Sequence, residues 1–485
     1  MSGLVSRARV TSVELWRFRA GSGAHGGECR ISASFSGGPE PGVAKVLSCL
    51  SFKVTLVRMT SSKVAIVRTS PKTVLEDYHR VMNLAGYQDV VDKSADTGLK
   101  VNISWHFFYP GSSTTPWQLE GVIGAMKRDG YDPALMHACH NRTVVIDAHL
   151  GERENKQIDV VQAHGLRNVH LYEGEEWIDV RDAVGDLADK FLCLNQVYPK
   201  GFRIPKRFIG ENIIHLPTVK THIFTTTTGA MKNAFGGLLN EHRHWTHPVI
   251  HETLVDLLMI QKKIHRGLFA VMDGTFAGDG PGPRCMIPHV KNVLLASQDQ
   301  VAIDAVAAKL MGFDPMSDCK FVRLAHEHGL GVGDPRDIEI VGDLDAGKEN
   351  WHFDGPFKKM TFASRNQHRI YWGPLKKPVE WSLKTWLAPW AYVASVSYHD
   401  LFWYPFYGKP RVEETLRSDW GRLFANWGKV EKDAEGRGYP DVGEEHPELV
   451  RTGLKHFAEG FRLVGMAVAE SPEFKKKPVK QPLHP

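Results

Sequence analysis

Cysteine is scarce in this sequence, and the few cysteines form no local ligand motif. Six cysteines are spread over 485 residues, and no C-x-x-C pair occurs. Iron–sulfur clusters and zinc ribbons commonly take their ligands from closely spaced cysteines, so we do not expect an iron–sulfur cluster here. Six cysteines are also too few for a disulfide framework in a chain of this length, which favours a reducing, cytoplasmic environment.

A charge excess is likewise lacking outside the first 58 residues. Residues 1–58 contain eight Lys/Arg and three acidic residues, which accounts for the whole net charge of +5, since the remaining chain contains 52 residues of each sign. A body with balanced charge gives no argument for nucleic-acid binding. With 42% hydrophobic and 24% charged residues, the composition is that of a soluble globular protein.

The first 58 residues lack both hydrophobic periodicity and the apolar core of a secretory signal. They are rich in Gly, Ser and Arg, and Met59 directly precedes the first convincing element. Two interpretations are open: an Arg-rich transit peptide, or a translated upstream region. We treat residues 1–58 as a disordered or non-native extension and exclude them from the fold.

Residues 59–345 alternate between apolar strand patterns and amphipathic helix patterns. Strands are expected at 64–68, 98–104, 143–146, 168–171, 212–216, 267–272 and 293–296. Helices are expected at 71–85, 116–128 and 301–311. This alternation predicts an α/β domain with a mostly parallel sheet and flanking helices.

The stretch 212–240 carries the densest group of ligand-type side chains. Its strand is expected to end at Pro217, because proline cannot donate to a sheet ladder. Lys220 and His222 are then expected in a loop. Threonines 225–228 are expected at the N-cap of a helix, and the glycines that follow in the stretch are expected to close or bend this helix. Ligands of open α/β sheets bind where strand ends meet loops and helix N-termini, and these residue types suit phosphate, carboxylate or an enolate-like intermediate. The alternative is a solvated loop with a well-capped helix.

Three acidic residues later in the chain are further candidates. Asp273 is expected at the end of a strand, before a glycine-rich loop that contains Asp279. Carboxylates in such a place suit a hard cation or acid–base chemistry, although a plain glycine-rich turn is the alternative. Asp304 falls in the apolar stripe of its helix and therefore needs a partner. That partner is either a lysine of the site or a structural group.

Four histidines, His242, His244, His247 and His251, cluster after the central stretch. The last two are four residues apart, a spacing that places metal ligands on one helix face. Pro248 lies between them, however, so a polar helix entrance is the other interpretation.

Residues 346–485 change character and become rich in aromatic side chains, especially between residues 371 and 407. Pro389, Pro405, His399 and Asp400 argue against a transmembrane helix there. We expect an aromatic-rich region, helical or irregular, that wraps the α/β body. Binding of a protein partner or a membrane surface through residues 381–407 is the alternative. The basic tail from Lys475 is expected to be disordered.

Several motifs occur together in a familiar order. They are K-T-H at 220–222, K-N-x-F-G at 232–236, D-G at 273–274 followed by G-D-G-P at 278–281, and A-S-x-D-x-V-A-x-D-x-V-A-A-x-L-M-G-F-D-P at 296–315. As a set they resemble the family called domain of unknown function 362, over residues 63–342. The resemblance implies an α/β core without a settled activity, and it pairs the family's K-x-N with Lys100 and Asn102 and its threonine-rich helix entrance with Thr114 and Thr115.

The same resemblance bears on cofactors. Some members of the family carry an iron–sulfur module, but the cysteine runs of that module are absent here. More distantly, the central stretch is similar in outline to the lactate-racemase family, which uses a lysine-tethered nickel pincer cofactor. His222 and Lys232 are the residues that this similarity points to, although that family's glycine-rich signature is not reproduced.

The sequence therefore favours an enzyme that acts on a small anionic substrate, a phosphate or a carboxylate, with a divalent metal as the candidate cofactor. The expected catalytic residues are His222, Lys232 and Asp273; the expected substrate-binding residues are Lys100, Asn102, Lys220, Asn233 and Thr228; and the expected metal ligands are Asp273 and Asp279. The alternative is a non-catalytic ligand-binding, cofactor-binding or assembly protein that docks through its C-terminal region.

Overall fold

The computed structural model describes residues 10–13, 33–35, 62–141, 143–239, 241–374, 376–428, 430–432, 438–440 and 454–473. The chain divides into two compact units, residues 1–58 and 59–485. In the first, strands β1 (Val10–Val13) and β2 (Ala33–Phe35) pair antiparallel. The predictions for the rest of residues 1–58 and for the tail from Lys475 lie outside the described residues.

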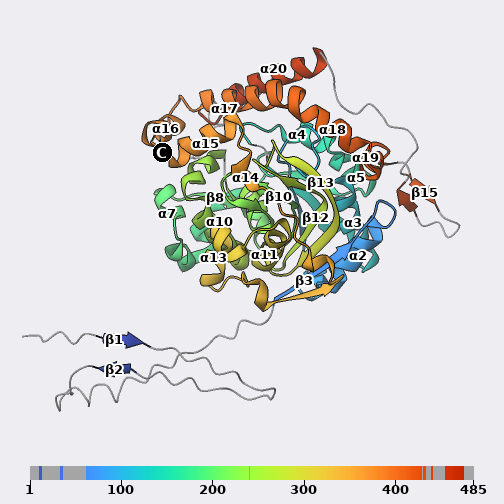
Figure 1. The fold of residues 1–485 in the computed structure, drawn as a ribbon, viewed down its shortest axis with the longest axis horizontal. Helices are drawn as coiled ribbons and strands as arrows, with labels where there is room; N and C mark the ends of the chain where they lie inside the picture. The colour runs from blue at the N-terminus through green and yellow to red at the C-terminus, as the bar shows by residue number, and fades with distance from the viewer. Residues whose placement is uncertain are drawn as a thin grey trace, which may run out of the picture. The chain divides into compact units, whose positions relative to one another are not determined.

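The second unit is built on one large sheet, which confirms the predicted α/β class (Figure 1). Its main path runs β14 (Ile338–Gly342), β3 (Ser62–Arg68), β13 (Ile287–Ser297), β12 (Leu268–Asp279), β9 (Asn212–Leu216), β4 (Thr97–Val101), β5 (Met136–His140) and β6 (Arg167–His170). Strand β13 is antiparallel to β12 and β3, and every other pairing along the path is parallel. Two smaller antiparallel pairs, β7 (Trp177–Asp179) with β8 (Arg203–Pro205) and β15 (Val430–Lys432) with β16 (Gly438–Pro440), lie outside this sheet.

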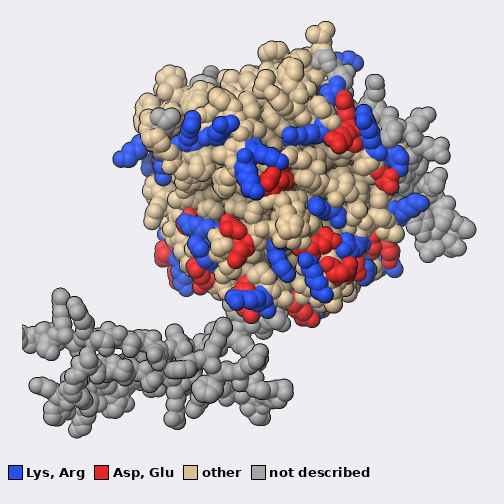
Figure 2. Space-filling model, in the orientation of Figure 1, with Lys and Arg blue, Asp and Glu red and all other residues tan. Residues whose placement is uncertain are grey.

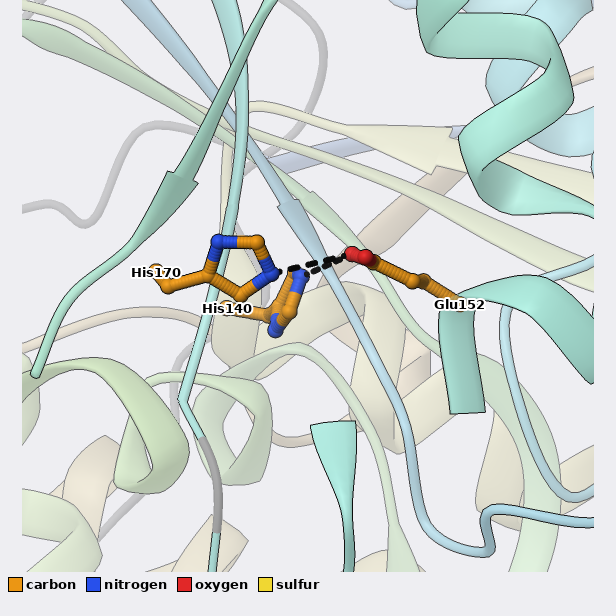
Figure 3. Close-up of side chains that lie close together, drawn as sticks. All are labelled: His140, Glu152 and His170. Atoms are coloured by element: carbon orange, nitrogen blue, oxygen red, sulfur yellow. Dashed lines mark hydrogen bonds and ion pairs between the residues drawn. The ribbon is translucent and has the colours of Figure 1, made fainter. Parts of the chain in front are cut away.

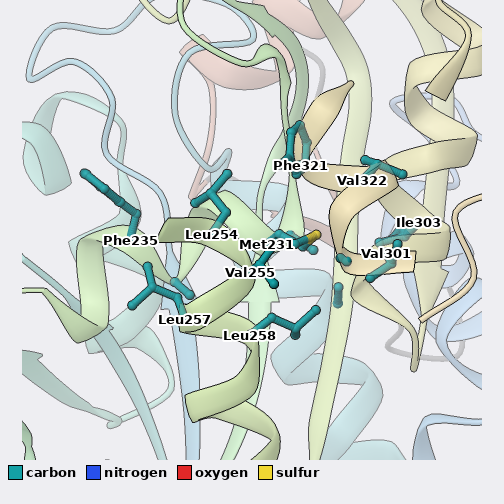
Figure 4. Close-up of a cluster of buried hydrophobic side chains, with 14 of the residues drawn as sticks. Met231, Phe235, Leu254, Val255, Leu257, Leu258, Val301, Ile303, Phe321 and Val322 are labelled. Carbon is teal, nitrogen blue, oxygen red and sulfur yellow. The ribbon is translucent and has the colours of Figure 1, made fainter. Parts of the chain in front are cut away.

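Alternating strand residues feed two hydrophobic cores, one on each face of the sheet. On β12, Ala270 and Met272 belong to the first core, whereas Phe269 and Val271 belong to the second. The first core is closed by α10 (Ile250–Ile264), α11 (Gln300–Met311) and α13 (Lys320–Glu327), whose packed side chains are seen in Figure 4. The second is closed by α2 (Val74–Leu84), α3 (Pro116–Arg128) and α5 (Gln157–Ala163). This double cover explains why the central strands read as continuous apolar runs.

The predicted strand at 143–146 is wrong. The third parallel strand is β5, and residues 143–146 form only an isolated bridge between Thr143 and Ile146. Directly after it, Asp147 caps α4 (Ala148–Glu154) by accepting from the backbone N–H of Leu150. The apolar run at 143–146 therefore belongs to a turn rather than to the sheet.

The central stretch departs from its prediction after Pro217. Strand β9 does end at Leu216, but the chain continues at once into β10 (Thr218–His222), so Lys220 and His222 lie in a strand and not in a loop. The threonines form β11 (Thr226–Thr228), which pairs antiparallel with β10, instead of capping a helix. The following helical turns are α8 (Ala230–Asn233) and α9 (Phe235–Leu238), and the latter contains both glycines of the motif.

Asp304 replaces the predicted threonine cap. Its two carboxylate oxygens accept from the backbone N–H groups of Ala230 and Met231 at the start of α8, at 2.6 and 3.1 Å. A Cβ atom on Gly229 would lie only 2.0 Å from this carboxylate, so the close approach requires glycine. The partner of Asp304 is thus a structural one and not a lysine of the site.

The C-terminal region is helical and wraps the α/β body, as predicted (Figure 1). Its helices are α14 (Gly355–Lys358), α15 (Phe362–Trp372), α16 (Lys376–Leu383), α17 (Pro389–Val396), the π-helix η8 (Ser397–Gly408), α18 (Lys409–Leu416), α19 (Asp419–Ala425) and α20 (Leu454–Ala469). Buried Asp400 ties them to the body by accepting from Trp105 Nε1 at 2.7 Å and pairing with His106 Nε2 at 3.2 Å. Among the described residues, no helix is both long enough and apolar enough to cross a membrane.

Candidate functional site

A cavity of about 680 Å³ lies between the sheet and the C-terminal helices. Its inner wall is formed where parallel strands end: residues 100 and 102–104 at the end of β4, residues 140–141 at the end of β5, and Pro217 directly after β9. This is the edge at which open α/β sheets bind ligands. Its outer wall comes from α15, α16 and α17, with side chains such as Ile370, Leu383 and Trp390.

The cavity is lined by many basic side chains and by no described Asp or Glu. The basic and imidazole residues are Lys100, Lys220, Lys232, Arg243, Arg284, Arg369, His140, His222, His244 and His247. We call this the cationic cavity. Buried ammonium and guanidinium groups are normally paired with carboxylates, and none of the described carboxylates lines this cavity.

Lys220 is the most deeply enclosed amine of the cationic cavity. Its Nζ atom donates to the backbone oxygen of Ser112 at 2.5 Å, to Thr218 Oγ1 at 2.9 Å and to Ser104 Oγ at 3.2 Å. All three acceptors are neutral. Burial, together with the positive charge of Lys232, holds the pKa of Lys220 well below its usual value.

Lys100 and Lys232 complete the group of amines. Lys100 donates to the backbone oxygen of Val101, and its pKa is lowered to about 8, mainly by burial. Lys232 lies 5.5 Å above the centre of the Phe235 ring, and no described residue accepts a hydrogen bond from it. Burial and nearby Arg243 lower its pKa to about 8 as well. Lys232 is therefore the amine with the most freedom to contact a ligand.

His222 is held in one tautomer. Its Nδ1 atom accepts from the backbone N–H of Phe224 at 3.1 Å, so the neutral ring carries its proton on Nε2. Burial and the charge of Lys232 lower its pKa well below the usual value, which keeps the imidazole neutral near pH 7. In this state the ring is a hydrogen-bond donor at Nε2 rather than a fixed positive charge.

The remaining predicted binding residues lie in the same cavity but have structural tasks too. Thr228 is opposite Lys220 in the β10–β11 register. Asn102 Nδ2 donates to the backbone oxygen of Ser112, and Asn233 Nδ2 donates to the backbone oxygen of Lys100 at 2.7 Å. The two asparagines thus fix the ends of the strands that carry the lysines.

Asp273 and Asp279 are placed differently from the prediction. Asp273 lies in the middle of β12 and not at a strand end, and its carboxylate accepts from Tyr78, Thr115, Trp117 and Thr275. Asp279 accepts from the backbone N–H groups of Asp354 and Gly355. Neither residue lines the cavity, and their roles as base and metal ligands stay predictions.

The histidines after the central stretch are divided between two elements. His247 lies in the 3-10 helix η5 (Glu241–Val249) together with Pro248, whereas His251 lies in α10, so the expected single helix face does not exist. His244 and His247 line the cavity, and the ring of His247 is 5.0 Å from that of Tyr371. Within the described residues, no candidate metal group includes either of them.

A different group of side chains has metal-ligand geometry. His140, Glu152 and His170, which we call the His–Glu cluster, have ligand atoms that all lie within 4.8 Å of one another (Figure 3). His149, His170 and Glu173 form an adjoining group of the same kind. Neither group was predicted from the sequence, although the H-x-x-E spacing of His149 and Glu152 on a helix was a signal. The position of the aromatic C-terminal region as the outer wall of the cavity was not predicted either.

The core of the chain is similar to a known protein family. Residues 97–309 match the family described as domain of unknown function (DUF362). The chain is thus similar to DUF362 proteins over this segment, which is less than half of its length. The segment supplies strands β4 to β13 and all the amines discussed above, whereas the outer wall of the cavity lies beyond its matched residues.

The chain is also similar to a curated cyanobacterial protein. "Thylakoid-associated protein sll1697" of Synechocystis sp. (strain ATCC 27184 / PCC 6803 / Kazusa) is 27% identical over 161 residues, which is 32% of this chain and 49% of that protein. The chain thus matches about half the length of this relative. No solved structure matches the chain.

Proposed function

We propose that the cationic cavity binds an anionic molecule, a phosphate or carboxylate, as the substrate of an enzyme. The observation that carries the proposal is the absence of any described acid from a lining that contains six Lys and Arg side chains. A bound anion would compensate the buried charge of Lys220 and Lys232, whose described contacts are neutral acceptors and an aromatic ring. Arginine and lysine are also the side chains that proteins use to recognise phosphate and carboxylate groups.

Two side chains support chemistry as well as binding. Lys232, with a pKa near 8, exchanges a proton close to neutral pH, as an acid–base group must. His222 presents Nε2–H from a neutral ring and can stabilise negative charge that develops on a substrate oxygen. Asp273, and the nickel pincer suggested by the outline similarity to lactate racemases, are not needed for these two roles.

The outer wall indicates the rest of the substrate. Ile370, Leu383, Trp390 and Tyr398 present apolar and aromatic surface opposite the amines. The cavity volume is well within the range of small-molecule sites and exceeds what a bare phosphate needs. We therefore expect an anionic head group attached to a hydrophobic body.

Calorimetric titration of the full chain with four probes tests this. Dodecyl phosphate and dodecanoate carry both features, inorganic phosphate carries only the anion, and dodecyltrimethylammonium carries only the hydrophobic chain with the opposite charge. We expect at least one of the two anionic amphiphiles to bind about 100-fold more tightly than the other two probes, which corresponds to about 3 kcal/mol. Equal binding of the cationic and anionic amphiphiles would contradict an anion site.

The non-catalytic alternative needs a separate measurement. A set of anionic amphiphiles incubated with the chain and recovered for mass spectrometry distinguishes an enzyme from a carrier. Conversion of one probe by the wild type, and its loss in Lys232→Met, supports catalysis. Unaltered recovery of every tightly bound probe favours a ligand-binding or assembly protein.

Exposed aromatic side chains favour a second function, attachment to a membrane surface. Phe461 on α20 and Trp381 on α16 are 66% and 63% exposed, and Trp386, in the turn between α16 and α17, is 69% exposed. In Figure 2 the upper part of the visible face, over α17 and α20, is largely free of charged residues, whereas both signs mix over the lower part. Exposed Trp and Phe side chains insert at lipid interfaces. Such a location would agree with the name of the thylakoid-associated relative.

Co-sedimentation with vesicles containing anionic lipid tests the attachment. We expect the wild type to sediment with the vesicles, and Trp381→Ser/Trp386→Ser to bind at least tenfold more weakly. Ile209→Ser/Leu344→Ser is the matched control, because these apolar residues are also exposed but lie outside the C-terminal helices. Equal weakening by both double variants would argue against a dedicated membrane surface.

A further inference from the structure

The His–Glu cluster lies at the carboxyl ends of two neighbouring parallel strands. His140 is the last residue of β5, His170 is the last residue of β6, and the two are paired in register. Paired residues point to the same side of a parallel sheet, and their ring centres are 4.5 Å apart. The backbone alone therefore brings the two imidazoles together.

Helix α4 supplies the third side chain. Its Asp147 cap fixes the start of the helix, and Gly151 allows close packing, since a Cβ atom there would lie 2.4 Å from a carbon of Ile103. One residue later, Glu152 Oε2 accepts from His140 Nε2 at 2.9 Å and from His170 Nε2 at 3.1 Å (Figure 3). Asn168 Nδ2 donates to the same oxygen at 2.8 Å and so orients the carboxylate from outside the cluster.

We propose that His140, Glu152 and His170 form a binding site for a divalent transition-metal ion of the Zn²⁺ type. Two imidazoles and one carboxylate are a donor set of catalytic zinc sites, in which a fourth position stays open for water or substrate. With metal–ligand bonds of about 2.0–2.1 Å, tetrahedral geometry places ligand atoms about 3.3 Å apart. The two N–O distances need to lengthen by only a few tenths of an ångström to reach that value.

The His–Glu cluster adjoins the cationic cavity through His140. His140 lines the cationic cavity and is 2% exposed, while Glu152 is 6% exposed. The Nδ1 atom of His140 has no hydrogen-bond partner in the described part of the chain. The metal proposal rests on the three ligand residues alone and does not depend on which anion the cavity binds.

Calorimetric titration of the untagged full chain with Zn²⁺, after chelator treatment, tests the assignment. We expect one ion per chain, and binding about 100-fold weaker or more in Glu152→Gln and in His170→Gln, since even outer partners of metal ligands change affinity by 10–100-fold. His170 is partly exposed, so this variant keeps the test valid if Glu152→Gln fails to fold. Co²⁺ is the second probe, and the strong visible bands of a low-coordinate ion are expected in the wild type and lost in both variants.

His137→Gln is the matched control. His137 is also a buried imidazole of β5 and also faces a carboxylate, Glu211 at 3.4 Å, but it belongs to no candidate metal group among the described residues. Its Zn²⁺ affinity should equal that of the wild type. The proposal is overturned if the wild type binds no Zn²⁺, or if a folded His170→Gln chain binds it as tightly as the wild type. Loss of binding in His149→Ala with full binding in Glu152→Gln would also overturn it, because the adjoining group would then hold the ion.

Discussion

The cationic cavity and the His–Glu cluster share His140, yet their charges are balanced in opposite ways. In the cavity, Lys220 and Lys232 face neutral acceptors and aromatic rings, and no described acid is present. In the cluster, each imidazole contacts the carboxylate of Glu152. The cavity therefore lacks an anion that a ligand can supply, whereas the cluster already contains its anion and offers nitrogen and oxygen donors to a cation. Under the two proposals, adjacent buried sites select ligands of opposite charge.

The largest expected effect comes from removing the unpaired charge of the cavity. We expect Lys220→Met/Lys232→Met to weaken the binding of an anionic amphiphile such as dodecyl phosphate by about 1000-fold, since each buried charge contact contributes about 2 kcal/mol or more. Methionine keeps most of the side-chain volume. Lys291→Met is the control, because Lys291 is a partly buried lysine that packs on Trp351 and Phe353 outside the cavity. Unchanged affinity in the double variant would contradict the proposal that these two lysines bind the anion.

The second-largest effect is expected when the carboxylate of the His–Glu cluster is removed. In chelator at pH 7, Glu152→Gln should lower the free energy of unfolding by about 3 kcal/mol, because removing one partner of a buried pair leaves the other polar groups uncompensated. Denaturant unfolding measures this loss. His149 is largely exposed, so His149→Ala should cost less than about 1 kcal/mol. Equal losses in the two variants would show that burial does not distinguish the cluster from surface pairs.

Much of the fold follows from local patterns that the sequence displays. Helices α3 and α11 and strands β3, β4 and β9 appear where apolar periodicity, proline and glycine predict them. The site was only partly predictable, because its geometry depends on contacts between distant residues. Pro217 does end β9, but its carbonyl accepts from the backbone of Asp273 and from Gln118, and the chain resumes as β10 beside β12. No local rule distinguishes such a resumed strand from a loop.

Other features of the structure also depend on contacts between distant residues and could not be predicted from local sequence. Asp304 caps a helix that precedes it by more than 70 residues, so the capping pattern around Thr228 was misleading. The aromatic content of the C-terminal region was plain in the sequence, but its position over the cavity depends on tertiary contacts such as Trp105 with Asp400. His140 and His170 are 30 residues apart and meet only because β5 and β6 pair in register.

A third, smaller effect is a pH-dependent gain of stability in the cavity. The pKa of Lys232 falls from 10.5 to about 8 on folding, so the unfolded chain binds more protons than the folded chain between these pH values. The cost in folding free energy of burying the charged lysine therefore disappears as the pH rises from about 8 to 10.5. The full shift corresponds to about 3 kcal/mol, and partial exposure reduces this to about 1–2 kcal/mol. Lys232→Met should therefore be more stable than the ligand-free wild type by about 1–2 kcal/mol at pH 7, with the difference vanishing near pH 10.5.

Urea unfolding of both chains across pH 7–10.5 measures this difference. The buried tyrosines and cysteines are common to both chains and cancel in the comparison. The exposed Lys72→Met variant controls for the loss of one lysine anywhere on the chain. A constant difference across this range would show that Lys232 is not desolvated and would weaken its assignment as an acid–base group.

The smallest effect is expected from a substitution that introduces a carboxylate into the cationic cavity. Gln367→Glu is nearly isosteric, and Gln367 lies on the outer wall of the cavity. The new carboxylate should neutralise part of the positive charge and weaken binding of dodecyl phosphate by about tenfold, or about 1.4 kcal/mol. Gln88→Glu makes the same chemical change at an exposed position outside the cavity and should leave affinity unchanged. If the two variants bind equally, the hydrophobic wall rather than the charge holds the ligand. If only Gln367→Glu weakens binding, the absence of acids is itself the feature that selects an anion.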